Sequence, residues 1–273
     1  MKTIAHISDL HFGTVEPELV EGLTEDLLEV NPDLLVVSGD LTQRARIRQF
    51  TAAKSFLEKL PFPKLIVPGN HDVPLFDIFR RFLSPLTRYK KYISEDLNPF
   101  YTNDRGFAIY GINTARSFTW KEGRISVEQM KELERKICPL PDSMFKIVVT
   151  HHPFIPPPDD DGIKLVGRSS RALVILDKCD VDLLLAGHLH QGYSGDVRRY
   201  YPKTNSSIVV VQASTAISNR IREQPNGYNL LTVEPGKIFI QVREWNGERF
   251  TQALEITYVK ENKEWHKLDR NPD

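Results

Sequence analysis

Residues 3–11 read TIAHISDLH, a short apolar run that ends in Asp9 and His11. The same arrangement, in which an apolar run leads into polar groups, recurs along the chain as LLVVSGD (34–40), KLIVPGNHD (64–72), FKIVVTHH (145–152) and VDLLLAGHLH (181–190). Near-continuous runs of Val, Ile and Leu are typical of strands that are covered on both faces. We therefore predict buried strands that each carry potential ligand groups at their C-terminal ends.

Segments with helical periodicity lie between these strands, and they cover 18–30, 49–60, 126–137 and 168–177. A further apolar run at 107–112 extends the alternation of strand and helix. Such alternation predicts an α/β protein with a largely parallel sheet.

The C-terminal part has a different pattern. Strand-like runs separated by turn residues cover 207–212, 228–233, 238–245 and 252–257. They predict an antiparallel sheet packed beside the first sheet. We expect residues 1–259 to form one domain, with 73–105 as a cap or insert within it and 260–273 as a charged, loose tail.

The charge balance bears on the class of partner. Lys plus Arg and Asp plus Glu both total 36, so there is no net field to attract a polyanion. This balance argues against a nucleic-acid partner. The insert mixes aromatic and basic residues, and its stretch 80–91 could supply a local phosphate-binding surface. The alternative is a solvated amphipathic helix over the core.

Cys138 and Cys179 are the only cysteines. They lack the spacing of a thiolate zinc site, and a secreted disulfide scaffold would carry more of them. We therefore expect two reduced thiols in a cytoplasmic protein. The first residues have no signal-peptide pattern, and no apolar run approaches the ~18 residues of a membrane-spanning helix. We expect a soluble protein with no membrane partner.

The polar groups at the strand ends can converge. Carboxyl ends of parallel strands are where open α/β sheets collect functional groups, and side chains two residues apart in extended backbone point the same way. Each group alone is compatible with an ordinary turn or a surface histidine, but their repetition at successive strand ends indicates a metal site. Imidazole with carboxylate and amide groups suits Mn, Fe, Co, Ni or Zn rather than Mg or Ca.

These residues also carry a resemblance. The chain resembles the calcineurin-like metallophosphoesterase superfamily over residues 9–190, through Asp9-Leu10-His11, Gly39-Asp40, Gly69-Asn70-His71-Asp72, His151 and Gly187-His188-Leu189-His190. The resemblance implies a four-layer αββα sandwich, in which two mixed β-sheets are flanked by helices. It also implies a centre of two divalent transition metal ions.

The resemblance assigns a role to each residue. Asp9, His11 and His190 would hold one ion, Asn70, His151 and His188 would hold the second, and Asp40 would bridge both. Two such ions can lower the pKa of a bridging water, and the resulting hydroxide would attack the phosphorus in line.

Other residues are expected to act beside the metals. His71 would stabilise the transition state or protonate the leaving oxygen. Asp72 would orient that imidazole, or it is a turn or cap residue. His152 follows a ligand directly and is a candidate for substrate contact.

Departures from the motifs of two phosphatase subfamilies narrow the class of possible substrates. Gln43 stands where purple acid phosphatases carry a ligand tyrosine, and Gln43 with Ala45 departs from the Ser/Thr protein phosphatase motif. The stretch 39–56 looks more like the bacterial class III cyclic nucleotide phosphodiesterases. We therefore expect a phosphodiesterase that acts on small phosphodiesters, with 3′,5′-cyclic nucleotides as one candidate.

Three alternatives stay open: a phosphomonoesterase, a nuclease of the same superfamily, and a non-catalytic scaffold with this fold. The presence of His71 and of every expected ligand argues against the scaffold. The C-terminal strands or the 73–105 insert could form a homodimer contact, although no residue requires one.

Overall fold

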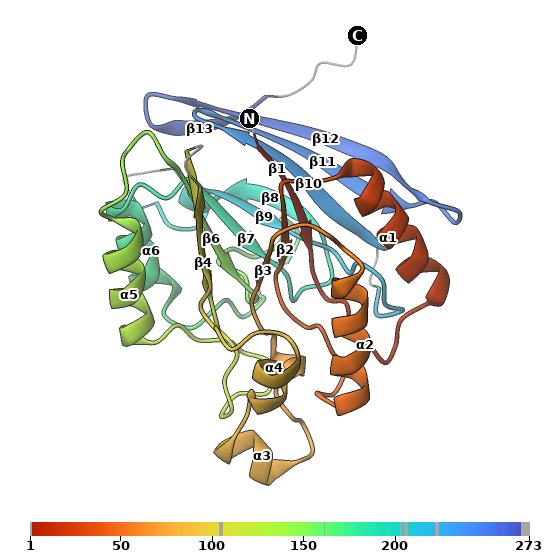
Figure 1. The fold of residues 1–273 in the computed structure, drawn as a ribbon. Helices are drawn as coiled ribbons and strands as arrows, with labels where there is room; N and C mark the ends of the chain where they lie inside the picture. Colours follow the sequence, from red (N-terminus) through yellow and green to blue (C-terminus); the bar gives the residue numbers. More distant parts are fainter. Residues whose placement is uncertain are drawn as a thin grey trace.

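The computed structural model describes residues 2–103, 106–160, 162–202, 204, 207–221 and 224–268. The last two residues of the 73–105 insert and residues 269–273 of the expected tail lie outside the described residues. Within the described residues, the strands form two sheets that pack against each other and are flanked by helices (Figure 1).

The first sheet combines the N-terminal and the C-terminal strands. Its order is β13-β12-β11-β10-β1-β2-β3, and the bounds are β1 (Lys2–Ile7), β2 (Leu34–Val37), β3 (Lys64–Ile66), β10 (Gly227–Glu234), β11 (Lys237–Trp245), β12 (Phe250–Glu261) and β13 (Glu264–Leu268). β1 to β3 are parallel, whereas β10 pairs antiparallel with β1. The expectation of a separate C-terminal antiparallel sheet is therefore wrong. The strands expected at 228–233, 238–245 and 252–257 extend the first sheet from its β1 edge, and the strand expected at 207–212 belongs to the second sheet.

The second sheet has the order β4-β5-β6-β7-β9-β8. Its bounds are β4 (Phe100–Asn103), β5 (Phe107–Ile112), β6 (Phe145–Thr150), β7 (Leu183–Ala186), β8 (Tyr193–Asp196) and β9 (Val209–Gln212). β5, β6, β7 and β9 run parallel, and β4 and β8 are antiparallel edge strands. Both sheets are mixed, as the resemblance implied.

The helices lie between the strands along the chain. Their bounds are α1 (Pro17–Val30), α2 (Ile47–Glu58), α3 (Ile78–Leu83), α4 (Thr87–Tyr92), α5 (Val127–Ile137) and α6 (Ser169–Lys178), with short 3-10 turns η1 (Asn70–Asp72) and η2 (Val197–Arg199). Helix α5 begins with a capping box, in which the Ser126 hydroxyl accepts from the Gln129 amide and the Gln129 side chain accepts from the Ser126 amide. This box satisfies donors that the first turn leaves unpaired.

The core explains the four layers. Alternate residues of β2 face opposite sides: Leu34 and Val36 pack between the sheets, whereas Leu35 and Val37 pack against α1 and α2. In the second sheet, Val148 packs toward α5 and α6 while its neighbours face the first sheet. Because both faces of the central strands are covered, β2, β5, β6, β7 and β9 are buried along their whole length and apolar almost throughout.

The 73–105 insert forms two short helices and an edge strand, and α3 and α4 protrude at one end of the molecule (Figure 1). Tyr89 of α4 is buried, and its hydroxyl donates to the Ile66 carbonyl (3.0 Å). Arg81 of α3 is also buried. The stretch 80–91 is therefore not one solvated helix, although Arg80, Lys90 and Lys91 remain exposed on it.

The expected loose tail is wrong for residues 260–268. β12 continues to Glu261 and turns into β13, where Lys260 pairs with Trp265. The Trp265 side chain is buried between the sheets. A charged sequence can form an edge strand when one face carries an apolar anchor of this kind.

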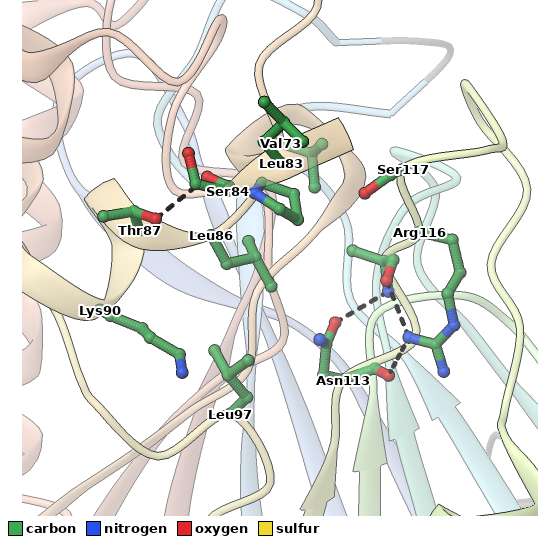
Figure 2. Close-up of a pocket in the computed structure, with 12 residues that line it drawn as sticks. Val73, Leu83, Ser84, Leu86, Thr87, Lys90, Leu97, Asn113, Arg116 and Ser117 are labelled. Atoms are coloured by element: carbon green, nitrogen blue, oxygen red, sulfur yellow. Dashed lines mark hydrogen bonds between the residues drawn. The ribbon is translucent and has the colours of Figure 1, made fainter. Parts of the chain in front are cut away.

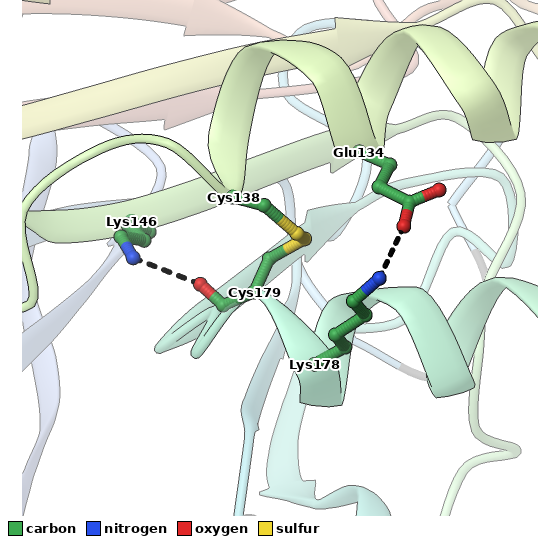
Figure 3. Close-up of a disulfide and its surroundings, with 5 residues drawn as sticks. All are labelled: Glu134, Cys138, Lys146, Lys178 and Cys179. Carbon is green, nitrogen blue, oxygen red and sulfur yellow. Dashed lines mark hydrogen bonds and ion pairs between the residues drawn. A yellow bond between two sulfur atoms is a disulfide. The ribbon is translucent and has the colours of Figure 1, made fainter.

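The cysteines differ from the expectation as well. Cys138 at the end of α5 and Cys179 at the end of α6 form a disulfide (Figure 3). The Lys146 ammonium donates to the Cys179 carbonyl (2.9 Å), and Lys178 pairs with Glu134 beside the bond. The prediction of two reduced thiols is therefore wrong in this structure. Sequence spacing could not reveal the pairing, because the two cysteines meet only when α5 and α6 pack together.

The disulfide closes a loop with a sequence separation of 41. In the loop-entropy model, a bond across such a loop stabilises the fold by about 4 kcal/mol. We expect reduction to lower the urea midpoint of unfolding, and a Cys138→Ser/Cys179→Ser variant to match the reduced protein. DTNB titration of unreduced, denatured protein should find no free thiol. Two titratable thiols per chain would contradict the bond.

Candidate metal centre

All the expected ligands follow strands, and both sheets contribute. Asp9 and His11 follow β1, Asp40 follows β2 and Asn70 begins η1 after β3. His151 follows β6, and His188 and His190 follow β7 of the second sheet. The site therefore exists only when the two sheets are packed.

The backbone conformation at the paired ligands differs from the extended one expected from the sequence. Asp9, His11, Asp40, His188 and His190 all have positive φ, between 47° and 77°. They lie in left-handed turns, so the extended geometry assumed for the two pairs is wrong. The side chains of His188 and His190 also lie in different groups of ligand atoms, so this pair does not converge on a single point. Such conformations are costly for residues with a β-carbon and concentrate at functional sites.

Two glycines permit these turns to approach each other. A β-carbon at Gly187 would collide with the Ser8 hydroxyl, and it would lie 2.7 Å from Asp9 Oδ2. A β-carbon at Gly69 would collide with Asp40. Glycine is required at both positions because the chain segments that carry the ligands nearly touch there.

Asp40 lies between two sets of ligand atoms. Its Oδ1 is 3.4 Å from His151 Nε2, and its Oδ2 is 3.7 Å from His11 Nε2. On the first side, Asn70 Oδ1 is 3.2 Å from His151 Nε2. On the second side, Asp9 Oδ1 is 3.5 Å from His11 Nε2 and 3.6 Å from His190 Nε2. This arrangement is the one expected of a carboxylate that bridges two ions.

Hydrogen bonds fix the tautomers of two histidines. His151 Nδ1 lies 2.7 Å from the Ser38 carbonyl, which can only accept. His190 Nδ1 lies 2.7 Å from Thr215 Oγ1, whose own proton goes to the Arg220 carbonyl. Both Nδ1 atoms therefore carry a proton, and each Nε2 is directed at the carboxylate and amide oxygens. Such a second hydrogen bond is typical of a metal-binding histidine.

The electrostatics also fit cations. Asp9 and Asp40 are fully buried. Burial would raise the pKa of Asp9, but His190, His11 and His151 offset it and hold the pKa below its usual range. Asp9 Oδ1 has no hydrogen-bond partner although it is buried. Asp9 Oδ2 accepts from Ser8 and His188, and Asp40 Oδ1 accepts from the His71 amide. Two buried carboxylates among ring nitrogens are stabilised further by a bound cation, so the residues present fit two divalent ions.

Of the two roles expected for Asp72, orienting His71 or capping a turn, its hydrogen bonds support the second. Its carboxylate accepts from the amides of Gly69, Leu41 and Thr42 and from the Thr42 hydroxyl, at 2.9 to 3.2 Å. Burial and the neighbouring Asp40 raise the pKa of Asp72 to about 6 despite these donors. Asp72 is a capping residue that ties the turn after β3 to the turn after β2.

His71 is instead held by Gln43 and by an arginine that the sequence analysis missed. Its Nδ1 donates to the Gln43 carbonyl (2.9 Å), and Arg220 Nη1 donates to its Nε2 (3.0 Å). Arg220 lies in the segment between β9 and β10, about thirty residues beyond the last motif. No spacing rule could connect it to His71, because tertiary packing alone brings the two together.

His152 lies beside His151 and His188, but both of its ring nitrogens contact other groups of the protein. Its Nδ1 contacts Thr114 Oγ1 (2.7 Å) and its Nε2 donates to the Lys121 carbonyl (2.9 Å), so both ring nitrogens have protein partners. Burial lowers the pKa of His152 well below its usual range. The suggested substrate contact is therefore not supported, and His152 instead anchors the segment that contains Lys121.

Two cavities adjoin the insert. A cleft of about 230 Å³ opens beside the metal ligands, and it is lined by Gln43, Arg44, Asn70, His71, Val73, Leu75, Trp120, Lys121 and Arg220. A larger cavity of about 430 Å³ lies between the insert and the segment after β5, where Figure 2 shows Lys90, Asn113 and Arg116 around it. None of the expected metal ligands lines the larger cavity, so we place the chemistry in the smaller cleft.

Comparisons with known proteins agree with this fold. The model of the calcineurin-like phosphoesterase family matches residues 2–192, and the chain belongs to this family. It is therefore a metal-dependent phosphoric ester hydrolase by class. No helix in the described part of the chain has both the length and the apolar character needed to cross a bilayer.

Two curated relatives and one solved structure illustrate the similarity. A probable cyclic nucleotide phosphodiesterase of Synechococcus sp. is 26% identical over 202 residues, 70% of this chain and 74% of that protein. A 3′,5′-cyclic-nucleotide phosphodiesterase of Nostoc sp. is 22% identical over 242 residues, 84% and 86% of the two chains. A dimetal phosphatase of Danio rerio shares the fold, with a TM-score of 0.68, 14% identity and coverage of 94% and 98%.

The donor set predicts a metal stoichiometry. We expect about two Mn²⁺ ions per chain by elemental analysis after reconstitution and desalting, because two groups of ligand atoms share Asp40. Asp40→Asn should lower the occupancy of both sites. His266→Ala is the matched control, since His266 is exposed on β13 away from these groups. Full occupancy in Asp40→Asn would contradict the bridging position.

Proposed function

We propose that this protein hydrolyses small phosphodiesters, with 3′,5′-cyclic nucleotides as the candidate substrate class. The observation that carries the proposal is the position of Asp40 between two sets of ligand atoms, beside a cleft lined by His71 and Arg220. The choice of diesters is supported by the curated relatives, whose names describe cyclic nucleotide phosphodiesterases.

The proposed ligand roles follow the two groups. Asp9, His11 and His190 would hold one ion, and His151 with the neighbouring Asn70 and His188 would hold the other. Asp40 would bind both. When bound, two such ions supply Lewis acidity, which polarises the phosphoryl oxygens and acidifies the attacking water. The imidazole-rich set suits Mn, Fe, Co, Ni or Zn.

Positively charged side chains beside the cleft bind the negatively charged phosphate group of the substrate. Arg220 and Arg44 lie on either side of His71, and Lys121 lines the same cleft. In a cleft of this kind, preformed donors stabilise negative charge that develops on the phosphoryl oxygens.

The sequence left two roles open for His71, and the hydrogen bonds favour one of them. Its proton is held at Nδ1 by Gln43, while Nε2 accepts from Arg220. A neutral His71 in this tautomer has no proton at Nε2 to give to a leaving group. We infer that His71 orients the Arg220 guanidinium and that the two side chains act as a pair at the phosphoryl group.

Rates on paired substrates test the proposal. Metal-reconstituted protein should cleave bis-p-nitrophenyl phosphate faster than p-nitrophenyl phosphate, and chelation should abolish both activities. Faster monoester cleavage would make the protein a phosphatase instead. Absence of metal-dependent turnover on either ester and on 3′,5′-cyclic AMP would contradict the proposed activity.

The same assay tests the pair at the phosphoryl group. His71→Ala and Arg220→Ala should each lower kcat/KM for the diester by roughly a hundredfold. Because the two side chains act together, the double variant should lose much less than the product of the single losses. Arg249→Ala, an exposed arginine in a distant turn, is the control. Fully multiplicative losses would show that His71 and Arg220 act independently.

A further inference from the structure

Trp120 is an exposed aromatic side chain that lines the candidate active-site cleft. Its side chain is 59% exposed, and it borders the same 230 Å³ cavity as His71, Asn70 and Arg220. A large aromatic ring left in water beside a reactive centre is a candidate for ligand contact. None of the metal-ligand motifs includes it.

Arg81 of the insert holds the segment that carries Trp120. The buried Arg81 guanidinium donates to the carbonyls of Pro74, Ser117 and Thr119, which join the insert to this segment. Its Cζ also lies 4.8 Å from the centroid of the Trp120 ring. The guanidinium thus fixes the ring through a cation–π contact. The 73–105 insert therefore has a structural role. Through Arg81 it fixes the segment that carries Trp120 and forms one wall of the cleft.

The chemistry of the cleft matches a ligand with two parts. Arg44, Lys121 and Arg220 supply positive charge for a phosphate group. Trp120 supplies an apolar, flat surface suited to a planar ring.

We propose that Trp120, positioned by Arg81, stacks on the planar base of the substrate and selects phosphodiesters that carry a nucleobase over those with a ringless alcohol. This inference rests on the proposed function, since it assumes that the phosphoryl group binds beside the metal ligands. It goes further by naming the residue that sets the preference among small diesters.

Binding measurements test the inference without turnover. 5′-AMP and ribose 5-phosphate share the sugar and the phosphate and differ only in the base. Titration calorimetry on the Mn²⁺-loaded protein should give an affinity for 5′-AMP roughly tenfold higher than that for ribose 5-phosphate, as expected for one base stacked on one aromatic ring. Trp120→Ala should remove this difference, and Trp120→Phe should retain most of it.

Two further variants separate stacking from general disruption. Phe118→Ala removes an aromatic ring in the same segment that is 87% exposed and does not line the cleft, so both affinities should stay unchanged. Arg81→Lys keeps the positive charge but cannot make the three hydrogen bonds of the guanidinium group. It should weaken the binding of 5′-AMP and leave the binding of ribose 5-phosphate unchanged. Thermal unfolding would check that each variant is folded.

Steady-state kinetics provide a second readout. For Trp120→Ala, KM for 3′,5′-cyclic AMP should rise roughly tenfold with little change in kcat, whereas KM for glycerophosphoethanolamine should not change. Equal affinities of the wild-type protein for the two binding probes, or equal losses of both in Trp120→Ala, would overturn the inference. If base-dependent binding is present but no diester is cleaved, the proposed function fails and the stacking role stands.

Discussion

The burial of Asp9 and Asp40 together is the constraint on which the rest of the structure depends. Two carboxylates without enough donors cannot lie side by side in a dry interior unless cations balance them. The chain surrounds them with imidazole nitrogens whose protons are directed outward, toward Ser38 and Thr215. The site is thus built to be completed by metal ions.

This constraint explains why both sheets are needed. One sheet supplies the carboxylates and Asn70, and the other supplies the histidines that follow β6 and β7. The apolar layer between the sheets holds the two sets of strand ends in register. The packing between the sheets therefore supports both the stability of the fold and the geometry of the site, because a shift of one sheet would separate Asp40 from His151. The strained turns at the ligands are offset by the same packing.

The sequence predicted the parts that depend on local patterns. Continuous apolar runs located the buried strands, and helical periodicity located α1, α2, α5 and α6. The ligand residues could be predicted because strand ends converge whatever the details of the turns. The left-handed turns themselves could not be predicted, and so the spacing argument pointed to a cluster of side chains that the structure does bring together, but through the wrong backbone geometry.

The remaining differences arise from contacts between distant segments. The pairing of β10 with β1, the Cys138–Cys179 bond and the approach of Arg220 to His71 all depend on tertiary packing. The charged stretch 260–268 became a strand because Trp265 fits between the sheets. In each case the local sequence was compatible with several structures, and the burial of contacts between distant segments determined which one formed.

The most direct test of the central claim is anomalous X-ray diffraction from crystals of the Mn²⁺-loaded protein. The account predicts two anomalous peaks on either side of Asp40, one against Asp9, His11 and His190 and the other against Asn70, His151 and His188. A single peak that leaves one of these groups empty, or peaks elsewhere with none at Asp40, would contradict a centre in which this carboxylate joins two ions.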